Sequence, residues 1–208
     1  MNSELITLAG RHVRLEPLTL DHAEALAAAS AEDPALYAWS PVPQGKDEAR
    51  HYIAVALEWQ RAGTALPFAV LRLADGRVVG STRFWQIEHW AWPKGNPRHG
   101  RAAPDVCEIG YTWYAKSAVR TGINTESKLL MLTHAFENWQ TLRVCLLTDV
   151  RNQRSRTAIE RIGGKFEGVL RAHRMAADYI PRDSARYSII AAEWHAVKQR
   201  LLGFLNPP

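Results

Sequence analysis

The apolar positions of the chain recur with two periods, and the period changes from one segment to the next. Residues 12–18 alternate polar and apolar side chains, as a half-buried strand does. Residues 125–139 place Leu129, Leu132 and Phe136 on one face at helical spacing. The pattern predicts strands over residues 12–18, 67–73, 77–86, 107–114, 143–148, 165–173 and 186–190, and helices over 22–31, 47–61, 125–139, 155–162 and 192–205. This alternation predicts a domain of mixed α/β class.

Capping and turn residues support several of these boundaries. Asp21 is a plausible N-cap for the alanine-rich helix that follows it. Asp75-Gly76 between two apolar runs is a strong hairpin signal. Gly163-Gly164 ends the helix predicted over residues 155–162.

Residues 88–105 fit neither period. They contain Trp90 and Trp92 together with Pro93, Gly95, Pro97, Gly100 and Pro104. A structureless segment of this length inside a domain is usually functional or disordered, and two tryptophans argue against simple disorder. We expect a long loop at an acceptor site or an interface.

Composition limits the classes of protein. At 208 residues, with 47% hydrophobic and 23% charged positions, residues 1–208 are expected to form one globular domain. No apolar run approaches the roughly 20 residues of a membrane helix. The first residues lack a basic region and a long apolar block, so a cytoplasmic location is expected. Cys107 and Cys145 lie in strand-like runs and are expected to be small buried apolar residues.

The charge favours an anionic ligand. The formal net charge is +5, and the isoelectric point is near 9.4. Because the basic residues are scattered along the chain, a small polyanion held locally fits better than a nucleic acid. No His, Cys or Asp spacing suggests a metal site.

A turn that opens a helix lies at residues 118–128. Its free backbone N–H groups, from Arg120 to Thr125, form a place to hold phosphate, and the helix dipole adds favourable charge there. The alternative is that Gly122 merely fits a turn.

Three blocks, in this order and at this spacing, carry a family resemblance. They are Glu108-Ile109-Gly110-Tyr111, then Thr121-Gly122-Ile123-Asn124-Thr125-Glu126-Ser127-Lys128, then Asn152-Gln153-Arg154-Ser155 with Ala158-Ile159-Glu160-Arg161-Ile162-Gly163. They resemble the GNAT acetyltransferases, in particular the branch that acetylates the N-termini of ribosomal proteins. The resemblance runs from Val13 to Leu201. It implies a mixed, mostly antiparallel sheet, splayed between its fourth and fifth strands, with helices on both faces. Cys107–Tyr114 and Arg143–Thr148 are then the splayed strands, with acetyl-CoA between them.

The phosphate turn departs from the family pattern. Val119, Gly122 and Asn124 stand where the family usually has Arg or Gln, Gly, and Gly or Ala. Arg120 is adjacent and can supply the charge, while backbone N–H groups do the binding. The acetyl-CoA residues that the resemblance implies are Trp113, Arg120, Thr121, Gly122, Ile123, Asn124, Thr125, Asn152 and Ser155.

Catalytic roles follow from the same resemblance. Glu108 is the first choice for the general base, with Glu88, His89 and Asp105 as rivals. Asn152 resembles the residue that holds pantetheine or an ordered water. Ser155 resembles the residue that protonates the leaving thiolate, and it could also cap its helix. Tyr111 and Tyr114 are alternative acids, and the expected acceptor-site residues are Trp85, Glu88, Trp90 and Tyr111.

The leading hypothesis is an acetyl-CoA-dependent N-acetyltransferase acting by direct attack of a primary amine on the thioester. The amine could be a protein N-terminus, a lysine or a small molecule. One alternative uses aminoacyl-tRNA on the same fold, with one basic face made by Arg98, Arg101, Arg151, Arg154 and Arg156. Another is a non-catalytic acyl-CoA-binding module. The family habit and the many tryptophans suggest a homodimer.

Overall fold

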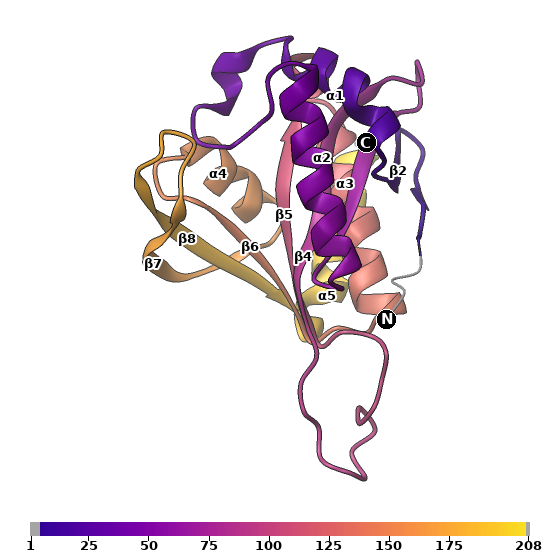
Figure 1. Cartoon of the computed structure of the whole chain (residues 1–208). Helices are drawn as coiled ribbons and strands as arrows, with labels where there is room; N and C mark the ends of the chain where they lie inside the picture. Colours follow the sequence, from indigo (N-terminus) through magenta and orange to yellow (C-terminus); the bar gives the residue numbers. More distant parts are fainter. Residues whose placement is uncertain (1–4, 207–208) are drawn as a thin grey trace.

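Eight strands form one mixed sheet in the computed structural model, which describes residues 5–206 (Figure 1). The strand order is β1-β2-β3-β4-β5-β6-β8-β7. Every neighbouring pair is antiparallel except β5 and β6, which run parallel. The strands are β1 (Leu8–Ala9), β2 (Val13–Pro17), β3 (Ala65–Arg72), β4 (Val78–Glu88), β5 (Val106–Tyr114), β6 (Arg143–Asp149), β7 (Lys165–Met175) and β8 (Pro181–Ile190).

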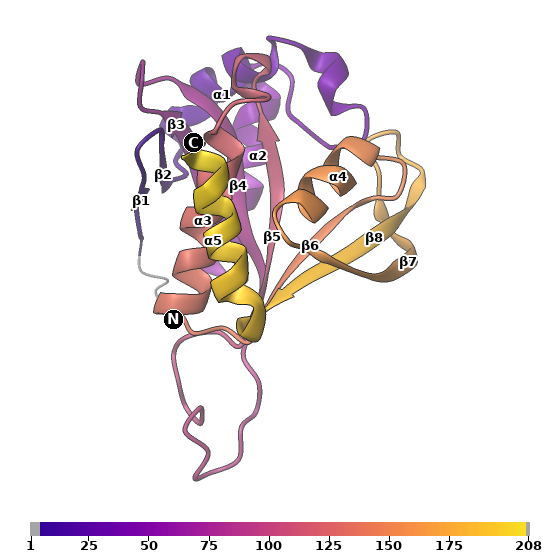
Figure 2. The same cartoon turned by 180° about the vertical axis from the view of Figure 1, so that it is seen from behind.

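Helices cover both faces of this sheet. The helices α1 (Ala23–Ser30) and α2 (Lys46–Arg61) lie on one face, and α3 (Ile123–Thr133) and α5 (Trp194–Leu205) lie on the other (Figures 1 and 2). The short helix α4 (Gln153–Arg161) packs against β6. Within the described residues, no helix combines the length and the apolarity that a bilayer crossing requires.

All predicted strands and helices are present, with corrected ends. The expected first strand is preceded by the two-residue β1, so the splayed strands are the fifth and sixth of this chain. Asp21 is not an N-cap, because it lies inside a 3₁₀ turn, Leu20–His22, that leads into α1. The α-helical part of the segment predicted over 125–139 ends at Thr133, where a π-helical turn, His134–Asn138, takes over.

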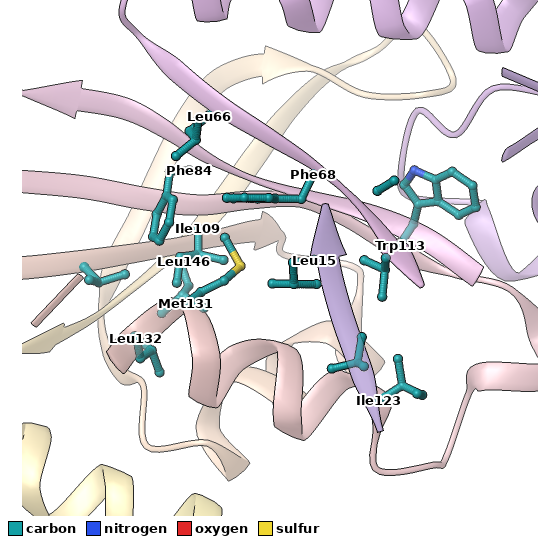
Figure 3. Close-up of a cluster of buried hydrophobic side chains, with 14 of the residues drawn as sticks. Leu15, Leu66, Phe68, Phe84, Ile109, Trp113, Ile123, Met131, Leu132 and Leu146 are labelled. Carbon is teal, nitrogen blue, oxygen red and sulfur yellow. The ribbon is translucent and has the colours of Figure 1, made fainter. Parts of the chain in front are cut away.

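One continuous apolar core fills both faces of the sheet, and a large part of it lies between the sheet and α3. Met131 and Leu132 of α3 are fully buried, as are Leu15 of β2 and Phe84 of β4. Figure 3 shows Met131 beside Leu15 and the β5 residue Ile109, all directed into one apolar cluster. The helical and strand periods of the sequence therefore meet in one continuous core, which fixes the start of α3 next to the end of β5.

The sheet divides between β5 and β6. Their parallel pairing joins Val106–Glu108 to residues 143–145 and stops there. Beyond this point β6 diverges from β5, as Figure 1 shows, and pairs along its whole length with β8. On its other side β5 also loses register with β4, where Tyr111 adopts a φ of 51° in a bulge.

A buried carboxylate ties the N-terminal strands to α3. Glu126 accepts hydrogen bonds from the backbone N–H groups of Arg11, His12 and Val13, at 2.8, 2.7 and 2.8 Å. A Cβ atom at Gly10 would lie 2.4 Å from Glu126 Cδ, so a glycine is needed for this close approach. No local sequence pattern predicts this contact, because it joins residues more than a hundred positions apart.

Removal of the Glu126 carboxylate is expected to destabilise the fold. Glu126→Ala leaves three backbone donors without their acceptor, and the Val13 N–H among them is buried. Since an unsatisfied buried group costs about 1–3 kcal/mol, a loss of at least about 1 kcal/mol is expected. Glu126→Gln keeps one oxygen and should cost less. Urea unfolding measures both, with the exposed Glu58→Ala as control. A loss for Glu126→Ala no larger than that of the control would contradict this role.

Candidate functional site

A cavity of about 430 Å³ occupies the division between β5 and β6. Residues from β5, β6, α3, α4, the β7–β8 hairpin and the segment around Tyr37 line it. Seven of the expected site residues are among them: Glu108, Tyr111, Trp113, Arg120, Asn124, Asn152 and Ser155. Blocks that lie far apart in the sequence therefore meet at one hollow.

The turn before α3 forms one end of the cavity. Arg120 has a φ of 61°, so the left-handed residue of the turn is Arg120, while Gly122 has an ordinary helical φ of −67°. The backbone conformation at Gly122 therefore does not require a glycine. Thr121 stabilises the turn, because its hydroxyl donates to Ala118 O at 2.7 Å and accepts from Ile123 N at 3.3 Å.

The side chains in the first turn of α3 point to two different sides of the helix. Asn124 and Lys128, four residues apart, face the cavity. Ile123 is buried in the apolar core, and Thr125 is buried beside Arg161, whose Nη1 lies 3.3 Å from its hydroxyl. Of the residues from 120 to 125 that were expected to bind phosphate, Arg120 and Asn124 line the cavity. The other four residues contribute backbone groups and packing around the turn, and their side chains do not line the cavity.

Asn152 and Ser155 lie at the start of α4. Asn152 is the N-cap, since its side-chain oxygen accepts from Ser155 N at 3.0 Å. Ser155 therefore does not cap the helix, and its hydroxyl has no hydrogen-bond partner among the described residues. Both residues line the cavity, so the Ser155 hydroxyl is available to a ligand.

The edge of β5 beyond Glu108 faces the division without a strand partner on the β6 side. Its backbone N–H and C=O groups are obligatory hydrogen-bonding groups. Tyr37 covers one of them, since its hydroxyl donates to Tyr114 O at 2.9 Å. The rest of this edge can bind an extended ligand, as a neighbouring strand would.

Glu108 lies at the point where the pairing stops. It is 2% exposed, and its two carboxylate oxygens accept from Arg174 Nη2 at 2.8 Å and Nη1 at 3.4 Å. Arg174 comes from β7, so this ion pair spans the division. A Cβ atom at Gly110 would lie 2.6 Å from Glu108 Oε1, and the missing side chain at Gly110 keeps this carboxylate in place.

Aromatic rings stack on the α2 side of Glu108. Tyr111 contacts Trp59 and Trp85, whose ring centroids lie 5.4 and 5.6 Å away. The buried Arg83 guanidinium lies 4.2 Å from the Tyr111 ring centroid and 4.7 Å from that of Tyr52. Tyr52 and Tyr111 line the cavity, whereas Trp85 packs against Tyr111 without lining it. The structure therefore does not bring Trp85 into the lining, contrary to expectation.

The long loop lies elsewhere. It hangs from the end of the sheet where β5 and β6 are still paired (Figures 1 and 2). Glu88 and Trp90, expected at the acceptor site, are therefore outside the cavity lining, as is His89. Asp105 organises this loop by accepting from Trp90 N at 2.8 Å and Trp92 Nε1 at 3.0 Å. Burial alone would raise the pKa of Asp105, but these bonds and Arg98 lower it overall, so Asp105 is a structural anchor.

Burial determines the properties of two other titratable side chains, Tyr114 and Cys107. Burial raises the pKa of the Tyr114 phenol, which disfavours its ionised form. Burial likewise raises the pKa of the Cys107 thiol. Cys107 is fully buried, in agreement with the expectation of a small apolar residue. The described residues contain no group of three His, Cys, Asp or Glu side chains that could hold a metal ion.

Sequence reasoning missed three cavity cations: Lys128, Arg174 and Arg182. Lys128 is buried, and its Nζ donates to Thr112 Oγ1 at 2.7 Å. Arg174 and Arg182 pair in register across the β7–β8 hairpin. Their positions at equal distance from the hairpin tip were the one available signal, but the sequence does not tell which hairpin face meets Glu108.

Comparison with known proteins identifies the family that shares this architecture. A family model described as an acetyltransferase (GNAT) domain matches residues 12–165. The chain belongs to the GNAT acetyltransferase family. This confirms the resemblance seen in the three sequence blocks, and the divided sheet confirms the fold that it implied.

Solved structures from the same family superpose over almost the whole chain. A GCN5-related N-acetyltransferase from Brucella melitensis is 29% identical, with a TM-score of 0.80, and the match covers 100% of this chain and 88% of that one. RimJ of Mycobacterium smegmatis, in complex with CoA-disulfide, is 25% identical, with a TM-score of 0.73 and coverage of 96% and 92%.

A curated relative matches over a shorter stretch. The Bacillus subtilis (strain 168) protein named "Putative ribosomal N-acetyltransferase YdaF" is 36% identical over 91 residues. The match covers 44% of this chain and 49% of the relative, so it spans about half the length of that protein.

The buried Lys128 predicts a pH dependence of stability. Burial lowers its pKa from 10.5 to about 7. Between these values the unfolded chain binds a proton that the folded chain lacks, so the free energy of unfolding should rise with pH, by at most about 1.4 kcal/mol per pH unit.

Lys128→Met should remove this slope and stabilise the protein most at or below neutral pH. Urea unfolding from about pH 7 to about pH 10 measures it, with the exposed Lys94→Met as control. If Lys128→Met unfolds with the same pH dependence as the parent protein, the assignment is wrong.

Proposed function

We propose that this protein is an acetyl-CoA-dependent N-acetyltransferase that acetylates a primary amine. The amine nitrogen forms a bond to the acetyl carbonyl carbon, the carbon–sulfur bond breaks, and one proton passes from the nitrogen to the CoA sulfur. The observation that carries the proposal is the division between β5 and β6, which places a helix N-terminus, an open strand edge and a buried carboxylate around one cavity. The CoA-disulfide bound to the related RimJ supports the choice of donor.

The donor site is proposed at the α3 end of the cavity. The first turn of α3 supplies backbone N–H groups and the positive end of its dipole to the phosphates. Arg120 lines the cavity next to this turn and adds a full charge. The open edge of β5 fits the amide-containing pantetheine arm, because both have alternating donors and acceptors.

Glu108 is proposed as the base that accepts the amine proton. It lies where the strand edge begins, and Arg174 fixes the orientation of its carboxylate. Arg174 Nη2 donates to Oε2 at 2.8 Å, whereas the contact of Nη1 with Oε1 is long, at 3.4 Å, and leaves Oε1 open to the amine.

Two further groups complete the proposed chemistry. The Ser155 hydroxyl, released from helix capping by Asn152, is proposed to donate the proton to the leaving sulfur. Backbone N–H groups of the unpaired β5 edge are proposed to stabilise the carbonyl oxygen as it gains charge. Asn152 is proposed to hold the donor arm.

The name of the Bacillus subtilis relative, a ribosomal N-acetyltransferase, favours a ribosomal protein among the possible acceptors. The aminoacyl-tRNA alternative is weaker, because the arginines that would form its basic face are divided. Arg98 and Arg101 lie on the long loop, while Arg151 pairs with Asp149 and Asp178 at the other end of the sheet. Homodimerisation and a cytoplasmic location stay predictions.

Calorimetry and thiol release test the function together. Acetyl-CoA should bind at micromolar concentration, and Arg120→Gln should weaken binding about tenfold by removal of one phosphate contact. Free thiol should appear when primary amines are added. Arg171→Gln, on the exposed side of β7, is the control. Absence of acetyl-CoA binding would refute the proposal, and binding without thiol release for any amine would favour the non-catalytic module.

Substitutions around Glu108 test its role. Glu108→Gln should lower kcat by about 10²–10⁴, as loss of a general base does. Gly110→Ala should displace the same carboxylate and lower kcat by about 10-fold to 100-fold. The exposed rival Glu88→Gln should retain the parent rate. Equal loss of rate in the Glu88 and Glu108 variants would eliminate Glu108 as the base.

A further inference from the structure

Arg182 is a cavity cation that no carboxylate neutralises directly. It lies on β8, lines the cavity and is partly buried. Within the described residues its guanidinium makes one hydrogen bond, from Nε to Ser184 Oγ at 3.0 Å. Because this bond uses Nε and fixes the guanidinium plane, the two terminal nitrogens are the donors left for a ligand.

The nearby carboxylates are already paired with other arginines. Asp149 and Glu108 are the acidic side chains whose charges reach Arg182. Asp149 is bound by Arg151, with Nη2 to Oδ2 at 2.7 Å, and Glu108 is bound by Arg174 at 2.8 Å. Both carboxylates near Arg182 are therefore already bound by another arginine, and neither forms an ion pair with Arg182.

The surroundings show the same positive potential. Burial and the adjacent Arg174 lower the pKa of Arg182. Burial and the charges of Arg174, Arg182 and Arg186 lower the pKa of His173, which shares Ser184 Oγ with Arg182. Behind Tyr52 and Tyr111 the buried Arg83 adds a third positive group. A cationic acceptor such as a polyamine would meet repulsion here.

We propose that the acceptor amine carries an acidic group, a carboxylate or a phosphate, which Arg182 binds beside Glu108. The inference rests on the proposed function and names the substrate class of the same site. Arg182 belongs to the acceptor end, because its β-hairpin partner Arg174 contacts Glu108, whereas the donor phosphates are assigned to Arg120 and α3. A guanidinium with two free terminal nitrogens matches a carboxylate or phosphate in geometry.

Matched pairs of acceptors test this assignment. The pairs are L-alanine with L-alaninamide, O-phosphoethanolamine with ethanolamine, and the dipeptide amides Ala-Glu-NH₂ with Ala-Gln-NH₂. They separate an α-carboxylate, a phosphate and an acidic peptide side chain as the source of the charge. In at least one pair the anionic member should have a kcat/KM higher by about tenfold or more, as a charge-assisted contact provides.

Variants then assign the preference to Arg182. Arg182→Gln should lower the kcat/KM of the anionic acceptor to that of its neutral partner, mainly by raising KM. The kcat/KM of the neutral acceptor should stay within about threefold of the parent value. Arg182→Lys should restore part of the preference. Arg171→Gln, the same change at an exposed position of β7, should alter neither acceptor. Circular dichroism confirms that each variant is folded.

The outcomes separate this inference from the proposed function. Acetyl-CoA binding together with equal or greater activity on the neutral amines overturns the inference alone. An anionic preference that survives Arg182→Gln also overturns it, because another residue then binds the acidic group of the acceptor. Acetyl-CoA binding without reaction of any pair counts against both the inference and catalysis. Absence of acetyl-CoA binding refutes the proposed function, and the inference falls with it.

Discussion

The parallel pairing of β5 and β6 ends after three residues, and the rest of the site depends on this interruption. An unpaired strand edge inside a domain is costly, because its N–H and C=O groups need partners. Here the edge faces a cavity closed by α3, α4 and the β7–β8 hairpin. Since β6 pairs fully with β8, the second half of the sheet stays stable while it diverges. The fold thus builds a hydrogen-bonding surface for a ligand from an incomplete sheet.

The cavity is also unusual in its charges. Glu108 and Arg174 bridge the division, so the two halves of the sheet are connected by an ion pair as well as by backbone. Lys128 and Arg182 lack a carboxylate partner among the described residues and both line the cavity. Buried cations without counter-ions reduce stability, and such groups are common where a ligand supplies the opposite charge. An acidic group on the ligand would supply the missing counter-ion at Arg182, whereas burial lowers the pKa of Lys128 and so favours its neutral form.

The sequence was sufficient for the elements but less so for the site. Strand and helix periods placed every major element, because the core needs one apolar face from each. The family blocks correctly indicated Glu108, Asn124, Asn152 and Ser155 as neighbours of one cavity. Errors arose where tertiary geometry decides. The loop with Glu88 and Trp90 extends from the end of the sheet where β5 and β6 are paired. Arg182 reaches the site on the β7–β8 hairpin, and no local sequence pattern shows which face of that hairpin meets Glu108. Arg120, and not Gly122, takes the left-handed conformation in the turn.

Hydrogen–deuterium exchange with and without CoA tests the central claim most directly, since exchange reports protection of individual backbone amides. If the open edge of β5 and the turn before α3 hold the donor, exchange should slow in residues 109–114 and 119–125 when CoA is added. The loop at residues 89–105 should exchange at an unchanged rate. Slower exchange confined to that loop, or none in residues 109–114, would contradict the account.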